Sequence, residues 1–367
     1  MALATYDFEK PILELEKQLE DMKSGKEKPD PDKIRDLEKK IEQTKKRVYK
    51  NLTPWQRVQL ARHMERPHSL DYIKALVEDW TEVHGDRGFS DDSAVVTGYG
   101  RFDGHPVSVV GQQKGKDTKE NLARNFGMMH PEGYRKAMRV MKTSEKFGLP
   151  ILIFIDTPGA FPGIGAEERG QAEAIARNIR DMFTITVPII IVIIGEGASG
   201  GALGIGVGDA TLMLENAWYC VISPEGCASI LWRDRAMAPR SAEALKLTAP
   251  DLLELGVIDE IVSEPLGGAH RIPEEAYEYV QKAISKRLKS LLSMDKEKML
   301  EERCNKYRKM GVYMEKGKKV GSDSIKPNMS TGSSSRPKKQ SSKSGKKSSS
   351  KKSAKKKDAG SKSTSEE

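Results

Sequence analysis

The stretch VPIIIVIIGEGASGGALGIGVG, from Val187 to Gly208, decides the fold of this chain. It begins with an unbroken β-branched run from Ile189 to Ile194, whereas a strand with one exposed face would alternate apolar and polar residues. We therefore predict a strand that is buried on both faces. Seven glycines follow between Gly195 and Gly208. Because glycine allows a ligand to approach the backbone closely, we expect this turn to present N–H groups rather than side chains.

The same pattern occurs once earlier in the chain. A buried strand is predicted from Leu149 to Phe154, followed by a loop rich in glycine and proline and a helix from Ala166 to about Met182. Paired strands are predicted over 94–102 and 106–112, joined by a turn at Asp103. Strands that end in glycine-rich loops and continue into helices indicate an α/β fold.

Three regions differ in composition. Residues 1–50 predict a helical hairpin, because apolar residues recur with heptad spacing on both sides of a break rich in glycine and proline. Two heptads per helix are too short to be stable alone, so their apolar stripe must be covered. Either the helices lie on the body of the same chain, or the hairpin is a docking arm for a partner. Residues 51–315 are predicted as the main domain, which opens with helix over 53–83. Residues 316–367 are Lys, Ser and Gly with almost no apolar residues, which predicts a disordered tail.

The net charge of +9 comes from this tail. Residues 316–367 contain 16 Lys or Arg and 4 Asp or Glu, whereas the whole chain contains 62 and 53. The rest of the chain is therefore slightly acidic, and the charge does not indicate a nucleic-acid-binding fold. A solvated tail is the simplest interpretation, and electrostatic attachment to an anionic partner is the alternative.

The three cysteines (Cys220, Cys227 and Cys304) are too few and too scattered for a disulfide framework or a zinc site. The six histidines do not show the spacing of a zinc motif. The acidic start is unlike a signal peptide, and no apolar run approaches the roughly 20 residues of a membrane helix. These features predict a cytoplasmic protein without a metal or a transmembrane segment.

Residues 195–200 match the dinucleotide motif GxGxxG after a strand. Glu215 lies 20 residues beyond the first glycine, where an acid would bind a ribose. However, residues 201–209 are expected to be too short for a crossover that supports a parallel strand. This spacing disfavours a dinucleotide site.

Residues 197–201 match GxSxG, the motif of a serine nucleophile. Asp259 and His270 follow Ser199 in the chain order of the serine hydrolases that use this motif. A serine hydrolase is therefore one alternative for the function. The other interpretation is that position 199 simply requires a small residue.

Catalysis by backbone groups is a third possibility. Preorganised N–H groups stabilise a negative charge that develops on a carbonyl-type oxygen, by roughly 3–4 kcal/mol per donor. Such a site needs glycines where a strand turns into a helix. Gly200 and Gly201 in one loop, and Gly159 and Ala160 in the other, both meet this requirement.

From about Asp7 to Val312 the chain resembles the alpha subunit of bacterial acetyl-CoA carboxylase carboxyltransferase. Several long motifs carry this resemblance, which makes it far more specific than one glycine pattern. In chain order they are NFGM (125–128), PEGYRKA (131–137), DTPGAFPG (156–163), AEERGQ (166–171), GEGASGGA (195–202), SPEGCASILW (223–232) and EPLGGAH (264–270).

The resemblance implies a crotonase (ClpP-like) fold, a superhelix of ββα units. It also implies an α2β2 carboxyltransferase that works with a biotin carboxyl carrier protein and a biotin carboxylase. In this family, carboxybiotin on the carrier gives its carboxyl group to acetyl-CoA, producing malonyl-CoA for fatty-acid biosynthesis. ATP is used by the biotin carboxylase, and zinc is expected only in the beta subunit. A non-catalytic scaffold subunit, with all chemistry on beta, is the alternative.

The resemblance also implies site residues. Gly200 and Gly201 match the turn whose N–H groups form the oxyanion hole for the ureido oxygen of biotin. Substrate contacts are expected from a second set, in which the cations are predicted to meet CoA phosphates or the carrier, or else simply acidic side chains: Gly159, Ala160, Gly197, Arg135, Lys114 and Arg169.

Overall fold

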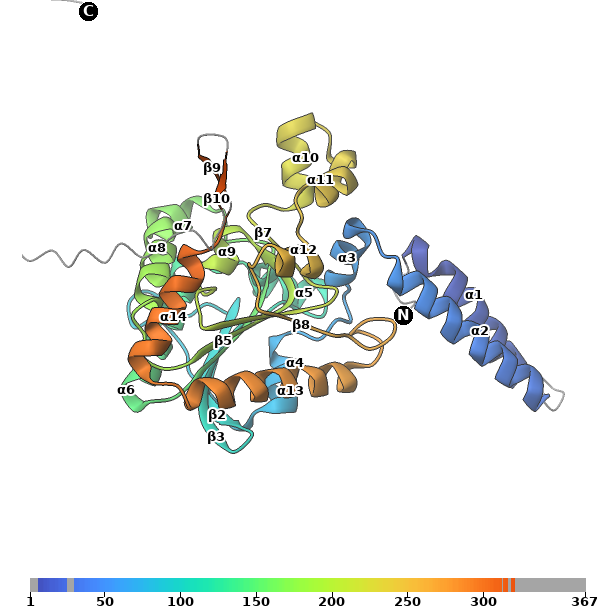
Figure 1. The fold of residues 1–367 in the computed structure, drawn as a ribbon, viewed down its shortest axis with the longest axis horizontal. Coiled ribbons are helices and arrows are strands. Elements are labelled where there is room, and N and C mark those ends of the chain that lie inside the picture. Colours follow the sequence, from blue (N-terminus) through green and yellow to red (C-terminus); the bar gives the residue numbers. More distant parts are fainter. Residues whose placement is uncertain (1–5, 25–29, 312, 316–317, 321–367) are drawn as a thin grey trace, which may run out of the picture. The chain divides into compact units, whose positions relative to one another are not determined.

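The computed structural model describes residues 6–24, 30–311, 313–315 and 318–320. Its central feature is an eight-stranded mixed sheet in the order β1-β2-β3-β4-β5-β6-β8, with β7 paired to β5 (Figure 1). The strands of this sheet are β1 (Glu78–Glu82), β2 (Val95–Phe102), β3 (His105–Gln112), β4 (Ile151–Thr157), β5 (Ile189–Ala198), β6 (Ala210–Leu214), β7 (Trp218–Cys220) and β8 (Glu260–Val262). A separate hairpin joins β9 (Tyr313–Glu315) to β10 (Lys318–Val320).

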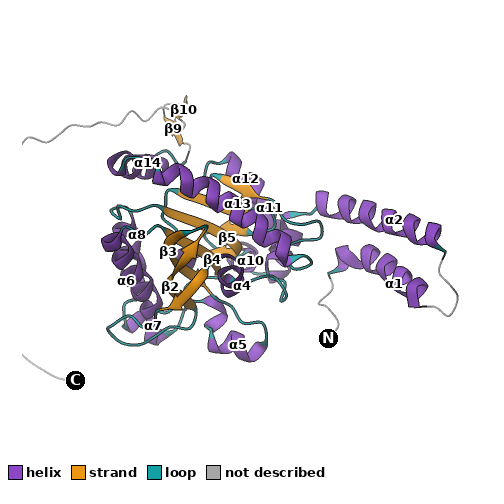
Figure 2. Cartoon of the chain, turned by 90° about the horizontal axis from the view of Figure 1, so that it is seen from below, coloured by secondary structure: helices purple, strands orange, loops and turns teal. Residues whose placement is uncertain are grey.

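Helices pack against this sheet as two pairs, α6 with α8 and α4 with α13 (Figures 1 and 2). Strands β2 and β3 are followed by helices α5 and α6, which is the strand–strand–helix order of the predicted fold, and the α/β class is confirmed. The helices are α1 (Lys10–Ser24), α2 (Pro31–Lys50), α3 (Pro54–Ala61), α4 (Ser69–Leu76), α5 (Thr118–Ala123), α6 (Pro131–Phe147), α7 (Ile164–Glu168), α8 (Gln171–Met182), α9 (Ser199–Leu203), α10 (Pro224–Trp232), α11 (Ala238–Ala244), α12 (Ala249–Glu254), α13 (Pro273–Leu292) and α14 (Lys296–Arg308).

Strand β5 is the centre of the sheet. All ten of its residues are buried, as the β-branched run predicts, and so are all seven of β4. It lies parallel to β4 on one side and to β6 on the other. Because the parallel strands end at the same edge, the loops after β4 and β5 begin side by side.

Two predictions about β5 are wrong. The strand continues four residues past Ile194, to Ala198. It also pairs in parallel with β6, Ile190 opposite Ala210, so the intervening segment is long enough for a crossover. The connection consists of the five-residue helix α9 and a tightly packed, glycine-rich segment that leads from α9 to β6. A Cβ on Gly208, for example, would lie 2.9 Å from the carbonyl oxygen of Ile189.

The predicted helical hairpin is confirmed as α1 and α2, which lie side by side in Figure 2. Ile12, Leu15 and Ile41 are buried, so this chain covers part of the apolar stripe, whereas Met22 towards the far end of α1 is 40% exposed. At the base of the hairpin, Tyr49 donates a hydrogen bond of 2.6 Å to the buried carboxylate of Glu9.

Two predicted helices are wrong in extent. The segment 53–83 forms α3, α4 and strand β1 instead of one helix, because the chain between α3 and α4 turns so that Arg66 enters the core. The helix expected from Ala166 splits into α7 and α8 at Gly170, whose φ is +84°. By contrast, α6 spans 131–147, and the paired strands β2 and β3 meet at the Asp103 turn as predicted.

Contacts divide the chain into residues 1–325 and 326–367. The second unit lies outside the described residues, and so does the predicted disordered tail from residue 321 onwards. Lys318–Val320 lie inside the predicted tail of residues 316–367 but form strand β10, so the start of that segment is predicted wrongly. The disorder predicted for residues 321–367 stays a prediction.

Candidate functional site

The two glycine loops predicted from sequence meet in the structure. Gly201, in α9, packs directly on the loop that follows β4. A Cβ on Gly201 would lie 2.2 Å from the carbonyl carbon of Gly159 and 2.5 Å from the backbone nitrogen of Ala160. Since no real Cβ approaches backbone so closely, this contact requires glycine. The first loop is closed by Thr157, whose hydroxyl donates to the carbonyl of Gly159 at 2.7 Å.

Helix α9 begins directly after β5, so its first N–H groups have no partner within the helix. Ser199 makes the turn with a φ of +57°, which is unusual for a residue that has a Cβ. Gly200 and Gly201 follow in this first turn. On the opposite side of the turn, the carbonyl of Gly201 accepts hydrogen bonds from Gln112 Nε2 at 2.8 Å and from Tyr134 Oη at 3.4 Å.

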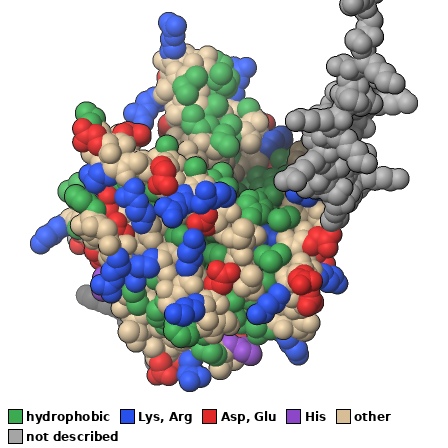
Figure 3. Space-filling model, turned by 90° about the vertical axis from the view of Figure 1, so that its left-hand side faces the viewer, with side chains coloured by type: hydrophobic (Ala, Val, Ile, Leu, Met, Phe, Trp, Pro, Cys, Tyr) green, Lys and Arg blue, Asp and Glu red, His purple; other side chains and the backbone are tan. Residues whose placement is uncertain are grey.

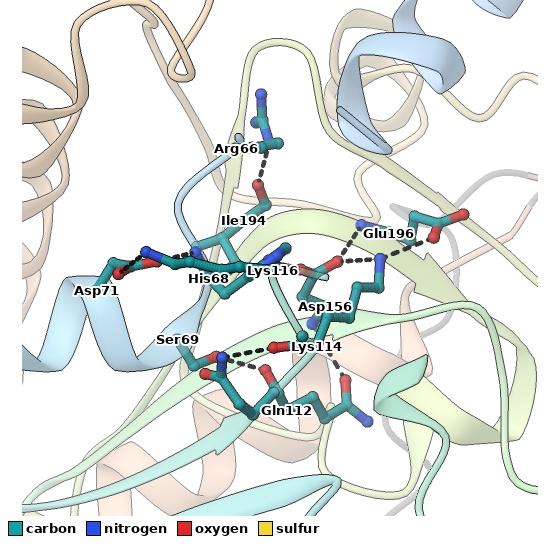
Figure 4. Close-up of polar contacts among 12 residues, drawn as sticks. Arg66, His68, Ser69, Asp71, Gln112, Lys114, Lys116, Asp156, Ile194 and Glu196 are labelled. Atoms are coloured by element: carbon teal, nitrogen blue, oxygen red, sulfur yellow. Dashed lines mark hydrogen bonds and ion pairs between the residues drawn. The ribbon is translucent and has the colours of Figure 1, made fainter. Parts of the chain in front are cut away.

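A chain of alternating charges lies at the base of the two loops (Figure 4). The ammonium of Lys114 lies 2.6 Å from Asp156 Oδ1 and 2.7 Å from Glu196 Oε2. The second oxygen of Glu196 accepts from Arg62 Nε at 2.6 Å. His68 Nδ1 lies 3.0 Å from Asp156 Oδ2. The cluster therefore joins the ends of β3, β4 and β5 to the residues before α4 and after α3.

Within this cluster, the pKa shifts of Asp156 and Lys114 both favour the charged forms of these two groups. Burial alone would raise the pKa of Asp156, but the charge of Lys114 and the hydrogen bond with His68 outweigh it and hold that pKa below its usual range. Burial would likewise lower the pKa of Lys114, but Asp156 and Glu196 raise it. Lys114 thus meets two acidic side chains, and substrate contact at Lys114 stays a prediction.

Strand β5 has a bulge beside this cluster, and a hydrogen bond to Asp156 accounts for it. Between Ile155 and Thr157 the register of β4 advances by two residues, while that of β5 advances by four, from Ile193 to Gly197. The N–H of Glu196, within this bulge, donates to Asp156 Oδ1 at 3.0 Å.

A pocket of about 260 Å³ opens beside the cluster, lined among others by Arg62, His68, Lys114, Phe126, Pro158 and Glu196. It therefore adjoins the loop that begins with Pro158 and Gly159.

Arg135 and Arg169 belong to a different cluster, around Glu132 on α6. Arg169 Nε donates to Glu132 Oε1 at 2.6 Å, and Arg135 Nη2 donates to the carbonyl of Arg169 at 2.6 Å. The guanidinium of Arg169 also lies 4.7 Å from the ring centroid of Phe89. The structure brings these two arginines together but joins Lys114 to other residues. Figure 3 shows Lys and Arg side chains gathered across the face on which α6, α7 and α8 lie.

Gly197 has a packing explanation. It lies inside β5, where a Cβ would come within 2.7 Å of the ring of Tyr219 on β7. Close strand packing therefore requires glycine at this position. Substrate contact at Gly197 stays a prediction.

The arrangement of a serine hydrolase is not formed. Asp259 accepts from the N–H of Thr211 at 2.6 Å and pairs with Lys306. His270 stacks on the ring of His63, with centroids 4.0 Å apart, and burial, His63 and Arg66 lower its pKa to about 3. No hydrogen bond joins Ser199, Asp259 and His270, all of which are described residues.

The described part of the chain has no group of three or more His, Cys, Asp or Glu arranged to hold a metal ion. Its helices include none that is both long enough and apolar enough to cross a membrane.

Comparison with known proteins identifies close sequence relatives. The sequence profile of the acetyl co-enzyme A carboxylase carboxyltransferase-like family matches residues 5–311. The acetyl-coenzyme A carboxylase carboxyl transferase subunit alpha of Geobacter metallireducens is 55% identical over 311 residues, 84% of this chain and 98% of that protein. The subunit of the same name from Halalkalibacterium halodurans is 53% identical over 310 residues, 84% of this chain and 95% of that protein.

Similar solved structures are more distant. The transcarboxylase 12S structure with methylmalonyl-coenzyme A bound has a TM-score of 0.49 at 20% identity, covering 62% of this chain and 44% of that one. A Pseudomonas malonate decarboxylase hetero-tetramer in complex with coenzyme A has a TM-score of 0.49 at 16% identity, covering 58% of this chain and 85% of that one.

Proposed function

The chain belongs to the acetyl-CoA carboxylase carboxyltransferase family, and we infer that it is the alpha subunit, a transferase that moves the carboxyl group of carboxybiotin to acetyl-CoA. The product, malonyl-CoA, is used for fatty-acid biosynthesis. The similarity extends over nearly the full length of these relatives and over 84% of this chain. The inferred function therefore rests on the chain as a whole and not on one motif.

The observation that supports a catalytic role for this chain is the contact between Gly201 and the Gly159–Ala160 peptide. It brings the turn at the start of α9 against a second glycine loop, with no bulky side chain between them. We propose that the N–H groups of Gly200 and Gly201 form an oxyanion hole for the ureido oxygen of biotin. Gly159 and Ala160 form the adjoining wall.

This arrangement fits the chemistry of carboxyl transfer. Loss of CO2 from carboxybiotin leaves negative charge on the ureido oxygen, where N–H donors are most effective. The charged oxygen is stabilised by backbone groups that are already oriented, so no side chain needs to titrate. When bound, carboxybiotin would supply the carboxyl group as CO2 and would accept the proton of the acetyl-CoA methyl group. The resulting enolate, held by the beta subunit, would then attack the CO2 to form the new carbon–carbon bond of malonyl-CoA.

The remaining components follow from membership of the family. We propose that the chain assembles with a beta subunit as α2β2 and receives carboxybiotin from the carrier protein. A biotin carboxylase uses ATP to load that carrier, and zinc belongs to the beta subunit. Arg135 and Arg169 are proposed contacts for CoA phosphates or the carrier, because both are partly exposed at 37% and 30%. The three free cysteines suit a cytoplasmic location.

An assay of the beta subunit with and without this chain tests the proposed function. We expect carboxyl transfer from the carrier to acetyl-CoA with both chains present, and no measurable transfer with beta alone. The alternative is a non-catalytic scaffold, in which all chemistry lies on beta. Transfer by isolated beta at a rate comparable to that of the complex would favour the scaffold.

The basic tail carries a separate proposal. With 16 Lys or Arg against 4 Asp or Glu, residues 316–367 suit electrostatic binding to an anionic partner. We expect deletion of these residues to weaken binding to heparin or to anionic lipid vesicles at low salt, and to leave carboxyl transfer unchanged. A filter-binding or vesicle-sedimentation assay checks this. Equal polyanion binding by the full chain and the truncated chain would contradict the proposal.

A further inference from the structure

Gln112, the last residue of β3, connects strand β4 to helix α9, which contains the second glycine loop. Figure 4 shows Gln112 beside Ser69 and Asp156. Its Oε1 accepts from the N–H of Asp156 on β4 at 3.2 Å. Its Nε2 donates to the carbonyl of Gly201 at 2.8 Å. Asp156 lies three residues before Gly159, so one amide side chain joins the bases of both loops.

The orientation of this amide is fixed by its partners. A backbone N–H only donates and a carbonyl only accepts, so the oxygen of Gln112 must face Asp156 and its nitrogen must face Gly201. The side chain is fully buried, which keeps water from competing for either bond. Ser69 fixes the residue itself, because its hydroxyl donates to the Gln112 carbonyl at 2.6 Å.

We propose that Gln112 is a positioning residue for carboxyl transfer, which sets the Gly201 turn in the orientation that receives the ureido oxygen. The inference rests on the proposed function, because it concerns the same turn. Gln112 does not contact the substrate in this account. It acts on the peptide that follows Gly201, and a displacement of about 1 Å in a catalytic group lowers rate by about 10²-fold.

The test compares Gln112→Leu with Gln113→Leu in the assembled complex. Gln113 is the matched control: it is also buried, accepts from the N–H of Leu70 at 2.8 Å and donates to the carbonyl of Lys114 at 2.7 Å. Each substitution thus removes one donor and one acceptor. For Gln112→Leu we expect kcat to fall by about tenfold or more, with the KM for acetyl-CoA unchanged. For Gln113→Leu we expect kcat within about threefold of wild type.

Three results would overturn the proposal: wild-type kcat in Gln112→Leu, the same loss of kcat in both variants, or a loss expressed as a higher KM. If Gln112→Leu does not assemble with the beta subunit, the variant Gln112→Glu tests the same proposal. It keeps the acceptor, and its carboxyl group donates to Gly201 only when protonated. We expect its kcat, relative to wild type, to be low at about pH 8 and to recover towards about pH 6. If the kcat of Gln112→Glu equals that of wild type at both pH values, the proposal is overturned. An inactive wild-type complex would instead count against the proposed function.

Discussion

The variant Gly201→Val is expected to abolish carboxyl transfer while the chain still assembles with its beta subunit. The Cβ of any residue at 201 would lie 2.2 Å from the carbonyl carbon of Gly159, and backbone at that position cannot rotate away as a side chain would. The two loops must therefore separate, which moves the N–H groups of the α9 turn. Loss of one oxyanion donor lowers kcat by about 10²–10³-fold, and we expect at least this effect. Steady-state kinetics of the purified complex measures it.

The matched control is Ser199→Ala, two residues earlier in the same turn. Alanine keeps the Cβ that Ser199 already has, so the variant adds no contact at its φ of +57°. We expect its turnover to stay within about threefold of wild type, since surface changes of this kind alter free energies by about 0.5 kcal/mol. Near-complete loss of turnover in Ser199→Ala would instead indicate a serine nucleophile. Normal turnover in an assembled Gly201→Val complex would contradict the oxyanion assignment.

Arg66→Met is expected to destabilise the fold by about 3–5 kcal/mol, because it leaves a buried carboxylate without its partner. Arg66 and Glu264 form a fully buried pair, with hydrogen bonds of 2.6 and 3.0 Å. Arg66 also donates to the carbonyl of Ile194, inside the β5 bulge, at 2.7 Å. Denaturant unfolding monitored by circular dichroism measures the change.

The control for this variant is Lys46→Met, which breaks an exposed pair with Glu42 and is expected to change stability by less than about 0.5 kcal/mol.

The pH dependence of stability provides a second test of the Arg66–Glu264 pair. Burial would raise the pKa of Glu264, but Arg66 and two backbone N–H groups lower it to about 2. The stabilising effect of the pair is thus complete above the unfolded pKa of about 4.3 and is lost as pH falls through about 2. The difference in free energy of unfolding between wild type and Arg66→Met should therefore shrink below about pH 4. A difference that does not change with pH would contradict a stabilising ion pair between Arg66 and Glu264.

Much of the fold is predictable from local patterns. The β-branched run of β5 predicted a strand buried on both faces, and heptad spacing predicted the hairpin of α1 and α2. The errors occurred where tertiary contacts override such patterns. Residues 78–82 form β1 instead of helix because Gly98 and Gly100 on β2 allow that strand to approach closely. The crossover after β5 was misjudged because sequence spacing does not show how tightly glycines pack.

The site is predictable in part. Glycine clusters pointed to both loops, and their contact at Gly201 required the three-dimensional structure. Gln112 at the end of β3 and Tyr134 on α6 were missed, since the sequence around a side chain gives no signal of the distant partner it will meet. Lys114 was predicted to meet CoA phosphates, the carrier or acidic side chains, and the structure shows acidic partners. Its two carboxylate partners come from β4 and β5, 42 and 82 residues away in sequence.

The most direct test of the central claim is a structure of the complex of this chain and its beta subunit with biotin bound. We expect the ureido oxygen to lie about 2.7–3.1 Å from the backbone nitrogen of Gly200 or Gly201, with Gly159 and Ala160 beside the ring. A ureido oxygen held only by groups of the beta subunit, with the α9 turn out of hydrogen-bond reach, would contradict it.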